Sequence, residues 1–289
     1  DMIDLHCHST ASDGSCTPTE LILMAKQSGL KALALTDHDN TNGLPEFELT
    51  AKKENFEAIL GIELACKVPD QLRCHIVGLF IDRQCRQLQE MLTQIVQWRN
   101  QRNVQILERL AEVGKPLSLE FVKSFCPGKV LGRPHIAEAL VARGHCQSRK
   151  EAFEQLIGRG CPAYVPRQAP APQQCIEGIQ AAGGLAIWAH PFSNSGLNTR
   201  NCKKIAMQLK EAGLDGIEAY YSMHKPSQTK AALKIAAELG LLVSGGSDFH
   251  GRQFPTLKLG VGCGKLKVPA EILPPLRQKA LERRQALSI

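Results

Sequence analysis

The chain has 289 residues and a formal net charge of +7, from 35 Lys and Arg residues against 28 Asp and Glu residues. With 43% hydrophobic and 22% charged residues and a mean hydropathy of −0.16, it has the composition of a globular protein of one or two domains, which excludes disordered and fibrous proteins. No apolar run reaches the roughly 18 to 20 residues of a membrane span, and the first residues lack a secretory-signal pattern, so we expect a cytoplasmic protein without a membrane partner.

Short apolar runs that end in polar residues alternate with helical patterns along most of the chain. The first run is residues 2–8, and a helix follows, with Thr17 as N-cap, Pro18 at its first position, a capping-box Glu20 and a stop at Gly29. Further strands are predicted at 31–35, 58–62, 75–80, 185–188, 216–219 and 241–243, and further helices near 172–182, 201–212, 227–239 and 270–286. This alternation predicts βα units on a parallel sheet.

Between residues 83 and 162 the alternation gives way to helical periodicity. A long amphipathic stretch carries apolar residues from Leu88 to Leu110, shorter helical pieces follow, and Gly160 with a cluster of prolines marks the exit. We therefore expect an inserted helical domain at 83–162 between two parts of one α/β domain, at 1–82 and 163–289.

Cysteine usage and charge say little about function. The eleven cysteines are odd in number and never at Cys-x-x-Cys spacing, so we interpret them as reduced thiols that mostly fill apolar space. The pI of about 8.9 permits an anionic substrate such as a nucleotide or RNA, although mild positive charge is also typical of an ordinary solvated surface.

Six of the nine histidines fall within or just beyond predicted strands, and acidic residues accompany them. His6 and His8 are two residues apart in one strand, so their side chains point to the same face. In a closed parallel barrel, residues at strand ends converge at the C-terminal face, where such enzymes place their active sites. The nine candidate metal ligands are His6, His8, Asp13, His38, Glu63, His75, His190, Asp248 and His250.

Each of these histidines taken alone would more often be a loop or core residue than a metal ligand. Nine nitrogen and oxygen donors at one edge of the fold, with no Cys-x-x-Cys pair to compete for a metal, change that balance. The set favours a cluster of two or three divalent ions, and imidazole combined with carboxylate suits Zn, Mn or Fe.

Six short motifs, in chain order, resemble those of the polymerase and histidinol phosphatase (PHP) superfamily. They are residues 4–9, 36–39, 61–63, His75, 189–191 and 246–250. The resemblance implies an α/β fold, a distorted (β/α)7 barrel, with a metal cluster that hydrolyses phosphoesters. It assigns one ion to His6, His8, Glu63 and Asp248, a second to Asp13, His38 and His250, and a third to His75 and His190 with Glu63 bridging. Many relatives have a histidine in place of Asp13, and an oxygen ligand there favours Mn, with Zn, Fe or Mg as alternatives.

Within this superfamily the chain is most similar to the YciV/TrpH-type branch, on residues 9–14, 132–137, 218–221 and His224. The branch implies a nucleoside 3′,5′-bisphosphate phosphatase, a 5′-to-3′ exoribonuclease on short 5′-phosphorylated RNA, or both. The ions would generate hydroxide from water and hold the phosphoryl oxygens, so no protein nucleophile is required. Consistently, the sequence has no Gly-x-Ser-x-Gly elbow and no Walker A motif.

Five residues are candidates for substrate contact or proton transfer. Arg133, in the insert, suits bidentate phosphate binding with His135 beside it, which predicts that the insert binds substrate; an exposed arginine and a helix-starting histidine are the alternatives. His224 is a candidate phosphate or leaving-group contact, and Tyr221 either stacks on a base or packs in the fold. The general acid would be His224 or Asp37.

Three other functions remain as alternatives. The same metal cluster would serve a histidinol-phosphate phosphatase, although neither the large insert nor the positive charge is needed for so small a substrate. A non-catalytic PHP module would be expected to lose several ligands, whereas all nine positions here hold competent ones. A purely nucleic-acid-binding protein lacks support from any recognition helix or aromatic platform. We therefore expect a nucleotide or short RNA as partner, without DNA-specific readout, and the sequence leaves the oligomeric state open.

Overall fold

The computed structural model describes residues 1–68, 72–126, 130–193 and 197–288, and the chain divides into two compact units. The first unit joins Asp1–Leu92 to Pro170–Ile289, and the second is Thr93–Ala169. The helix α3 (Arg86–Glu112) begins in the first unit and ends in the second. The second unit overlaps most of the helical range 83–162 expected from the sequence.

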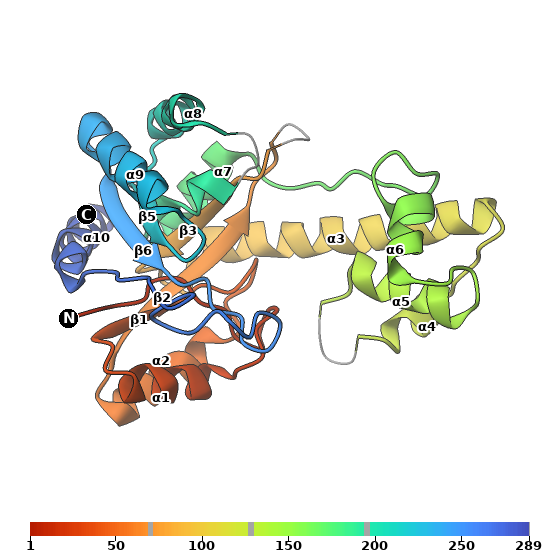
Figure 1. Cartoon of the computed structure of the whole chain (residues 1–289), viewed down its shortest axis with the longest axis horizontal. Coiled ribbons are helices and arrows are strands. Elements are labelled where there is room, and N and C mark those ends of the chain that lie inside the picture. Colours follow the sequence, from red (N-terminus) through yellow and green to blue (C-terminus); the bar gives the residue numbers. More distant parts are fainter. Residues whose placement is uncertain (69–71, 127–129, 194–196, 289) are drawn as a thin grey trace. The chain divides into compact units, whose positions relative to one another are not determined.

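Six strands of the first unit form one sheet, in sequence order (Figure 1). They are β1 (Ala32–Leu35), β2 (Glu57–Ala65), β3 (His75–Leu79), β4 (Leu185–Trp188), β5 (Gly216–Tyr221) and β6 (Leu242–Gly246). The pairs β1–β2, β4–β5 and β5–β6 are parallel, but β3 is antiparallel to both of its neighbours. The expectation of a wholly parallel sheet is therefore wrong at β3, because the segment 66–74 between β2 and β3 is too short for the crossover that a parallel pair requires.

Residues 2–8, predicted as the first strand, join the two edges of this sheet. The Asp4 N–H donates to Ala32 O on β1, and the Leu5 N–H donates to Gly245 O on β6. The segment makes isolated bridges rather than a continuous strand, because its backbone bonds are divided between two neighbours. The result is a curled sheet with both parallel and antiparallel strands. Together with its helices it forms an α/β fold, which confirms the predicted fold class.

Helices pack around the sheet of the first unit, and their ends follow ordinary capping chemistry. The N-cap of α1 is Thr17, whose hydroxyl accepts the Glu20 N–H while the Glu20 carboxylate accepts the Thr17 N–H. The other long helices are α2 (Leu44–Glu54), α7 (Pro172–Ala181), α8 (Thr199–Glu211), α9 (Pro226–Leu239) and α10 (Leu273–Leu287), after α1 (Pro18–Gln27). Of these, α2 was not among the predicted helices. Short 3₁₀ turns occupy Pro191–Ser193 and Ala270–Ile272.

The core of the first unit lies between the sheet and α10. Apolar side chains of the 2–8 segment, such as Ile3 and Leu5, pack with Leu79 and Ile187 of the strands and with Leu276 of α10. Burial of these side chains, worth roughly 1.5 to 3 kcal/mol each, fixes the strands and therefore the polar residues at their ends.

The second unit has a separate core. The later part of α3 packs with α4 (Leu119–Lys123), α5 (Arg133–Ala142) and α6 (Arg149–Ala152), which continues into a π-helical turn at Phe153–Ile157. Ile106, Leu110, Ile136 and Leu140 are buried at its centre. Among the residues described in either unit, no helix has the length and apolar content needed to cross a membrane.

Candidate metal centre and active site

All nine predicted metal ligands lie in the first unit, and their donor atoms form three overlapping groups. Within each group the donor atoms lie within 4.8 Å of one another. The inner group is His6, His8, Glu63 and Asp248; the outer group is His8, Asp13, His38 and His250; the third group is Glu63, His75 and His190. The structure thus brings together eight donors from six separate motifs, and Asp13 from the loop that follows the first motif.

Glu63, near the end of β2, is the centre of this arrangement and is 1% exposed. Its Oε2 lies 3.3 Å from His6 Nε2, 3.2 Å from His8 Nε2 and 3.3 Å from His38 Nδ1, and its Oε1 lies 2.9 Å from His75 Nδ1 and 3.1 Å from His190 Nε2. Burial alone would raise the pKa of Glu63, but the surrounding histidines, His6 foremost, hold it well below its ordinary value. Glu63 therefore offers a carboxylate oxygen to the inner group and to the third group, and could help to hold a cation at each.

The inner group is buried and tightly constrained by backbone contacts. The Asp248 N–H donates to His6 O at 2.8 Å, and a Cβ at Gly246 would lie 2.4 Å from the Cβ of His6, so this close approach requires glycine. Asp248 itself has a φ of +60°, an uncommon backbone conformation for a residue other than glycine, of the kind found at functional sites.

The charge balance of the inner group fits a cation. His6 Nε2, which faces the inner group, and His8 Nδ1, which lies 3.9 Å from Asp13 of the outer group, are buried without a hydrogen-bond partner among the described residues. His8 Nε2 lies 2.9 Å from Asp248 Oδ1. Burial alone would lower the pKa of His8, but the hydrogen bonds with Asp248 and Glu63 raise it to about 10. In the metal-free protein the positive charge is carried by protons, and divalent ions would take their place on the same nitrogens.

The outer group is more open to solvent. The Asp13 side chain is 49% exposed, and its carboxylate lies 3.2 Å from His250 Nε2 and 3.6 Å from His38 Nε2. Partial burial raises the pKa of Asp13, but the hydrogen bond from His250 and the charges of His38 and His250 outweigh it and lower the pKa to about 2. Burial lowers the pKa of His38 to about 4, so its imidazole is neutral at pH 7 and available as a ligand.

Asp37, a predicted general acid, makes contacts of a different kind. Its Oδ1 accepts the Ser9 N–H at 2.7 Å and the Ser12 hydroxyl at 2.6 Å, and its Oδ2 accepts the Ser9 hydroxyl at 2.7 Å. These bonds hold the loop that carries Asp13. They favour a positioning role, and the general-acid assignment of Asp37 stays a prediction.

Tyr221 is the last residue of β5, and His224 lies three residues further along the chain. The Tyr221 hydroxyl donates to Asp248 Oδ2 at 2.9 Å, so this side chain holds a candidate ligand, while its role in base stacking stays a prediction. His224 Nδ1–H donates to Ala219 O at 2.9 Å, and its Nε2 is buried without a hydrogen-bond partner among the described residues. Burial lowers the pKa of His224, so the ring is neutral and Nε2 presents a lone pair.

Arg133 and His135 lie in the second unit, at the beginning of α5. The Arg133 guanidinium lies over the Phe153 ring, 5.5 Å from its centroid, and is 3.4 Å from Ile157 O. His135 Nδ1 accepts the Gly132 N–H at 3.0 Å and so caps the helix. The contact of His135 matches the helix-starting alternative, and substrate binding by either residue stays a prediction.

Two buried carboxylates that touch the ligands lie within the motifs at 4–9 and 218–221, but no role was predicted for them from the sequence. Glu218, 2% exposed on β5, contacts His6 and His190. Asp4, fully buried, accepts hydrogen bonds from the Ser247 hydroxyl and backbone N–H. The available signal was an acidic residue inside an otherwise apolar strand pattern, which is costly unless the charge is paired.

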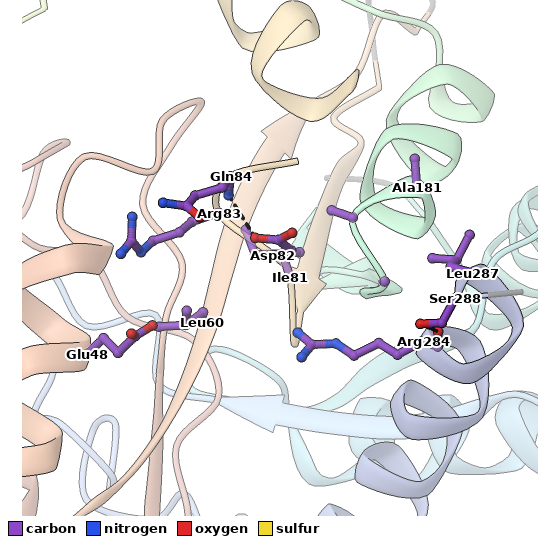
Figure 2. Close-up of a pocket in the computed structure, with 12 residues that line it drawn as sticks. Glu48, Leu60, Ile81, Asp82, Arg83, Gln84, Ala181, Arg284, Leu287 and Ser288 are labelled. Atoms are coloured by element: carbon purple, nitrogen blue, oxygen red, sulfur yellow. Dashed lines mark hydrogen bonds between the residues drawn. The ribbon is translucent and has the colours of Figure 1, made fainter. Parts of the chain in front are cut away.

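A cavity of about 510 Å³ lies elsewhere in the first unit, and none of the nine candidate ligands lines it (Figure 2). Its lining includes Asp82 and Arg83, which follow β3, and Arg284 of α10. Because β3 begins at the candidate ligand His75, these residues lie toward the opposite end of that strand. Acidic and basic side chains are both present, so the cavity has no clear preference for an anion.

Comparisons with known proteins agree with this geometry. Residues 4–157 match the PHP domain family. The chain is 36% identical to a 5′-3′ exoribonuclease of Haemophilus influenzae, over 86% of this chain and 89% of the relative, and 32% identical to a 3′,5′-nucleoside bisphosphate phosphatase of Chromobacterium violaceum, over 86% and 87%. A crystal structure of a proposed metal-dependent phosphoesterase from Bifidobacterium adolescentis superposes with a TM-score of 0.75 and 30% identity, over 96% of this chain and 95% of the other.

Proposed function

Because this chain belongs to the PHP domain family and is a hydrolase of phosphoester bonds, we propose that its substrates are nucleoside 3′,5′-bisphosphates, short 5′-phosphorylated RNAs, or both. The observation that carries the proposal is the set of three linked donor groups, in which His8 joins the inner group to the outer one and Glu63 joins the inner group to the third. The relatives named for these two activities align over most of this chain. Both activities require recognition of a terminal phosphate next to the phosphoester that is hydrolysed.

The nine donors would hold two or three divalent ions, with manganese our choice because Asp13 adds an oxygen ligand to the outer group. Bound there, the ions supply the Lewis acidity that activates water and stabilises phosphoryl oxygens. The chain's own part is to fix the donors. Glu63 holds the groups together, Asp248 is held by Tyr221, and Asp37 holds the loop of Asp13.

We propose that His224 contacts the leaving group of the substrate through Nε2, which is buried in this structure, so the ring must move to reach a substrate. Because Nδ1–H is committed to Ala219 O and the ring is neutral, Nε2 accepts a hydrogen bond and does not donate one. A ribose hydroxyl can donate a hydrogen bond to Nε2, whereas a fully ionised phosphate has no proton to donate. We keep Arg133, a permanently charged guanidinium, as the proposed phosphate contact, and the second unit as the proposed substrate-binding domain.

The test is a phosphate- and nucleotide-release assay on the purified chain with Mn²⁺. The substrates are a nucleoside 3′,5′-bisphosphate, a short 5′-phosphorylated RNA, the same RNA with a 5′-hydroxyl, and histidinol phosphate, with His8→Ala as the blank. We expect turnover of at least one of the first two, loss of turnover in the variant and on chelation, and a strong preference for the 5′-phosphorylated RNA over its 5′-hydroxyl form.

The other outcomes would contradict the proposal in different ways. Turnover of histidinol phosphate alone would replace the substrate class and keep the metal cluster. Equal turnover of the two RNAs would remove terminal-phosphate recognition. No turnover of any substrate with Mn²⁺, Zn²⁺, Fe²⁺ or Mg²⁺ would leave a non-catalytic role.

A further inference from the structure

Glu218 belongs to none of the three donor groups, yet it touches two of them. Its Oε2 lies 2.7 Å from His6 Nδ1, and its Oε1 accepts the backbone N–H of His190 at 2.8 Å. His6 is a member of the inner group and His190 of the third group. The carboxylate is 2% exposed, so these two contacts replace nearly all of its hydration.

An irregularity in β5 places Glu218 at the site. Residues three apart in a regular strand point to opposite faces, yet Glu218 and Tyr221 both contact candidate ligands. The register between β5 and β6 shifts between Glu218 and Tyr220, which is how an extra residue re-aims a side chain.

The contact with His6 decides which imidazole nitrogen faces the other ligands. A carboxylate accepts and does not donate, so Nδ1 of His6 must carry a proton, and Nε2 is left for a metal. His6 Nε2 lies 3.3 Å from both Glu63 Oε2 and Asp248 Oδ1. The lone pairs of these three atoms face one another, and a cation between them would relieve their repulsion.

The contact with His190 acts on the backbone. His190 has a φ of +31°, an unfavourable conformation for a residue with a side chain. Its N–H is bound to Glu218 and its Nδ1 to the Ser193 hydroxyl at 2.9 Å, which leaves Nε2 directed at Glu63.

We propose that Glu218 is a positioning residue that prepares the inner and third groups together, by fixing the tautomer of His6 and the backbone of His190. The proposal rests on the proposed metal cluster. Its specific consequence is that loss of Glu218 weakens metal binding at both groups, whereas loss of a partner that serves one group weakens only that group.

Glu218→Gln tests this with almost no change in shape. A glutamine side chain has one acceptor atom, whereas His6 Nδ1–H and the His190 N–H are two donors. If the amide oxygen faces His190, the amide NH₂ faces His6 and favours the tautomer that cannot bind metal through Nε2. If it faces His6, two N–H groups oppose each other at His190. Either orientation disrupts a metal position.

The experiment measures metal stoichiometry and affinity by chelator competition with Zn²⁺, together with the Nδ1–H proton resonance of His6 in the zinc-loaded, ¹⁵N-histidine-labelled protein. For Glu218→Ala, which removes both acceptor atoms, we expect affinity about 10- to 100-fold lower at two positions and a shifted or lost His6 resonance, whereas Glu218→Gln should lose affinity at the one position that its amide oxygen does not face. Ser193→Ala should weaken only the position of His75 and His190. Glu177→Gln, the same change on the exposed face of α7, should alter nothing.

The outcomes separate this inference from the proposed function. Wild-type metal binding and an unchanged His6 resonance in Glu218→Gln would overturn the role of Glu218 and leave the phosphoesterase intact. A wild-type protein that binds no metal would overturn both. Should Glu218→Gln fail to fold, the wild-type spectrum decides, because absence of a protected Nδ1–H on His6 in the zinc-loaded protein contradicts the assigned tautomer.

Discussion

The inner and outer donor groups share His8 but are held in different ways. His6 and His8 lie on the 2–8 segment, Glu63 lies on β2 and Asp248 follows β6, and His6, His8 and Glu63 are at most 1% exposed. In the outer group, Asp13 lies on a loop and is 49% exposed. Buried imidazole and carboxylate groups need a cation to compensate for lost hydration, whereas exposed ones are solvated by water. The comparison predicts that a metal ion would bind tightly at the inner group and more weakly and exchangeably at the outer group.

Glu63→Gln should have the largest effect, because it alters the one side chain that contacts the inner group, the third group and His38 of the outer group. Loss of the carboxylate charge that the inner and third groups share, worth several kcal/mol, predicts kcat/KM at least about 10³-fold lower. The assay is hydrolysis of the best substrate from the release assay with Mn²⁺. Glu57→Gln, an exposed position on the same strand, is the matched control. Activity within tenfold of wild type would break the assignment of Glu63 as the centre.

Asp13→Ala should lower the metal affinity of the outer group without changing that of the inner group. It removes an oxygen ligand from the outer group only, so we expect about 100-fold weaker binding of one metal equivalent and unchanged binding at the inner group. Chelator competition with Mn²⁺ resolves the equivalents. Asp13→His should restore an outer ligand and shift preference from Mn²⁺ toward Zn²⁺. A uniform loss across all equivalents would show that the groups do not behave separately.

Asp37→Asn should have a smaller effect of the same kind. Charge-assisted hydrogen bonds to Ser9 and Ser12, worth about 1.5 to 3 kcal/mol, hold the loop of Asp13, so outer-group affinity should fall by about tenfold. The pH profile of kcat distinguishes this role from that of a general acid. If the limb of the profile that reports the acid disappears in the variant, Asp37 is the acid that the sequence predicted.

Tyr221→Phe should affect the inner group by a few-fold. The change removes the hydroxyl that donates to Asp248 and keeps the aromatic face, with a net cost of about 0.5 to 1.5 kcal/mol in metal affinity. Comparison with Tyr221→Ala tests base stacking, because only the loss of the ring would raise KM. Equal KM values in both variants would argue against stacking.

The smallest effect concerns pH and His224. Burial lowers the pKa of His224 below its unfolded value of about 6.5, so the folded chain binds fewer protons between these two pKa values. The contribution of His224 to the unfolding free energy is therefore present above pH 6.5 and is lost as the pH falls toward the folded pKa. In thermal melts of the metal-free protein, wild type should lose stability relative to His224→Gln between pH 7.5 and 5.5. A constant difference would contradict a buried, neutral ring.

Much of the candidate site was predictable because strand periodicity is local. The spacing of His6 and His8 places both side chains on one face, and Glu63 and His190 each come where an apolar run ends. His75 differs, because it begins its strand. It reaches the same edge of the sheet only because β3 runs antiparallel, with His75 opposite Ala65 at the end of β2.

The sequence by itself determined the fold class and predicted the nine donors and a separate helical region, since hydrophobic periodicity and residue type are properties of short segments. Only the tertiary structure decided that His8 belongs to the outer group as well as to the inner one, that Glu63 contacts five histidines from four separate motifs, and that Glu218 contacts His6 and His190 at once. The physical reason is that these contacts join residues on different strands, and their distances depend on the direction, register and bulges of the sheet.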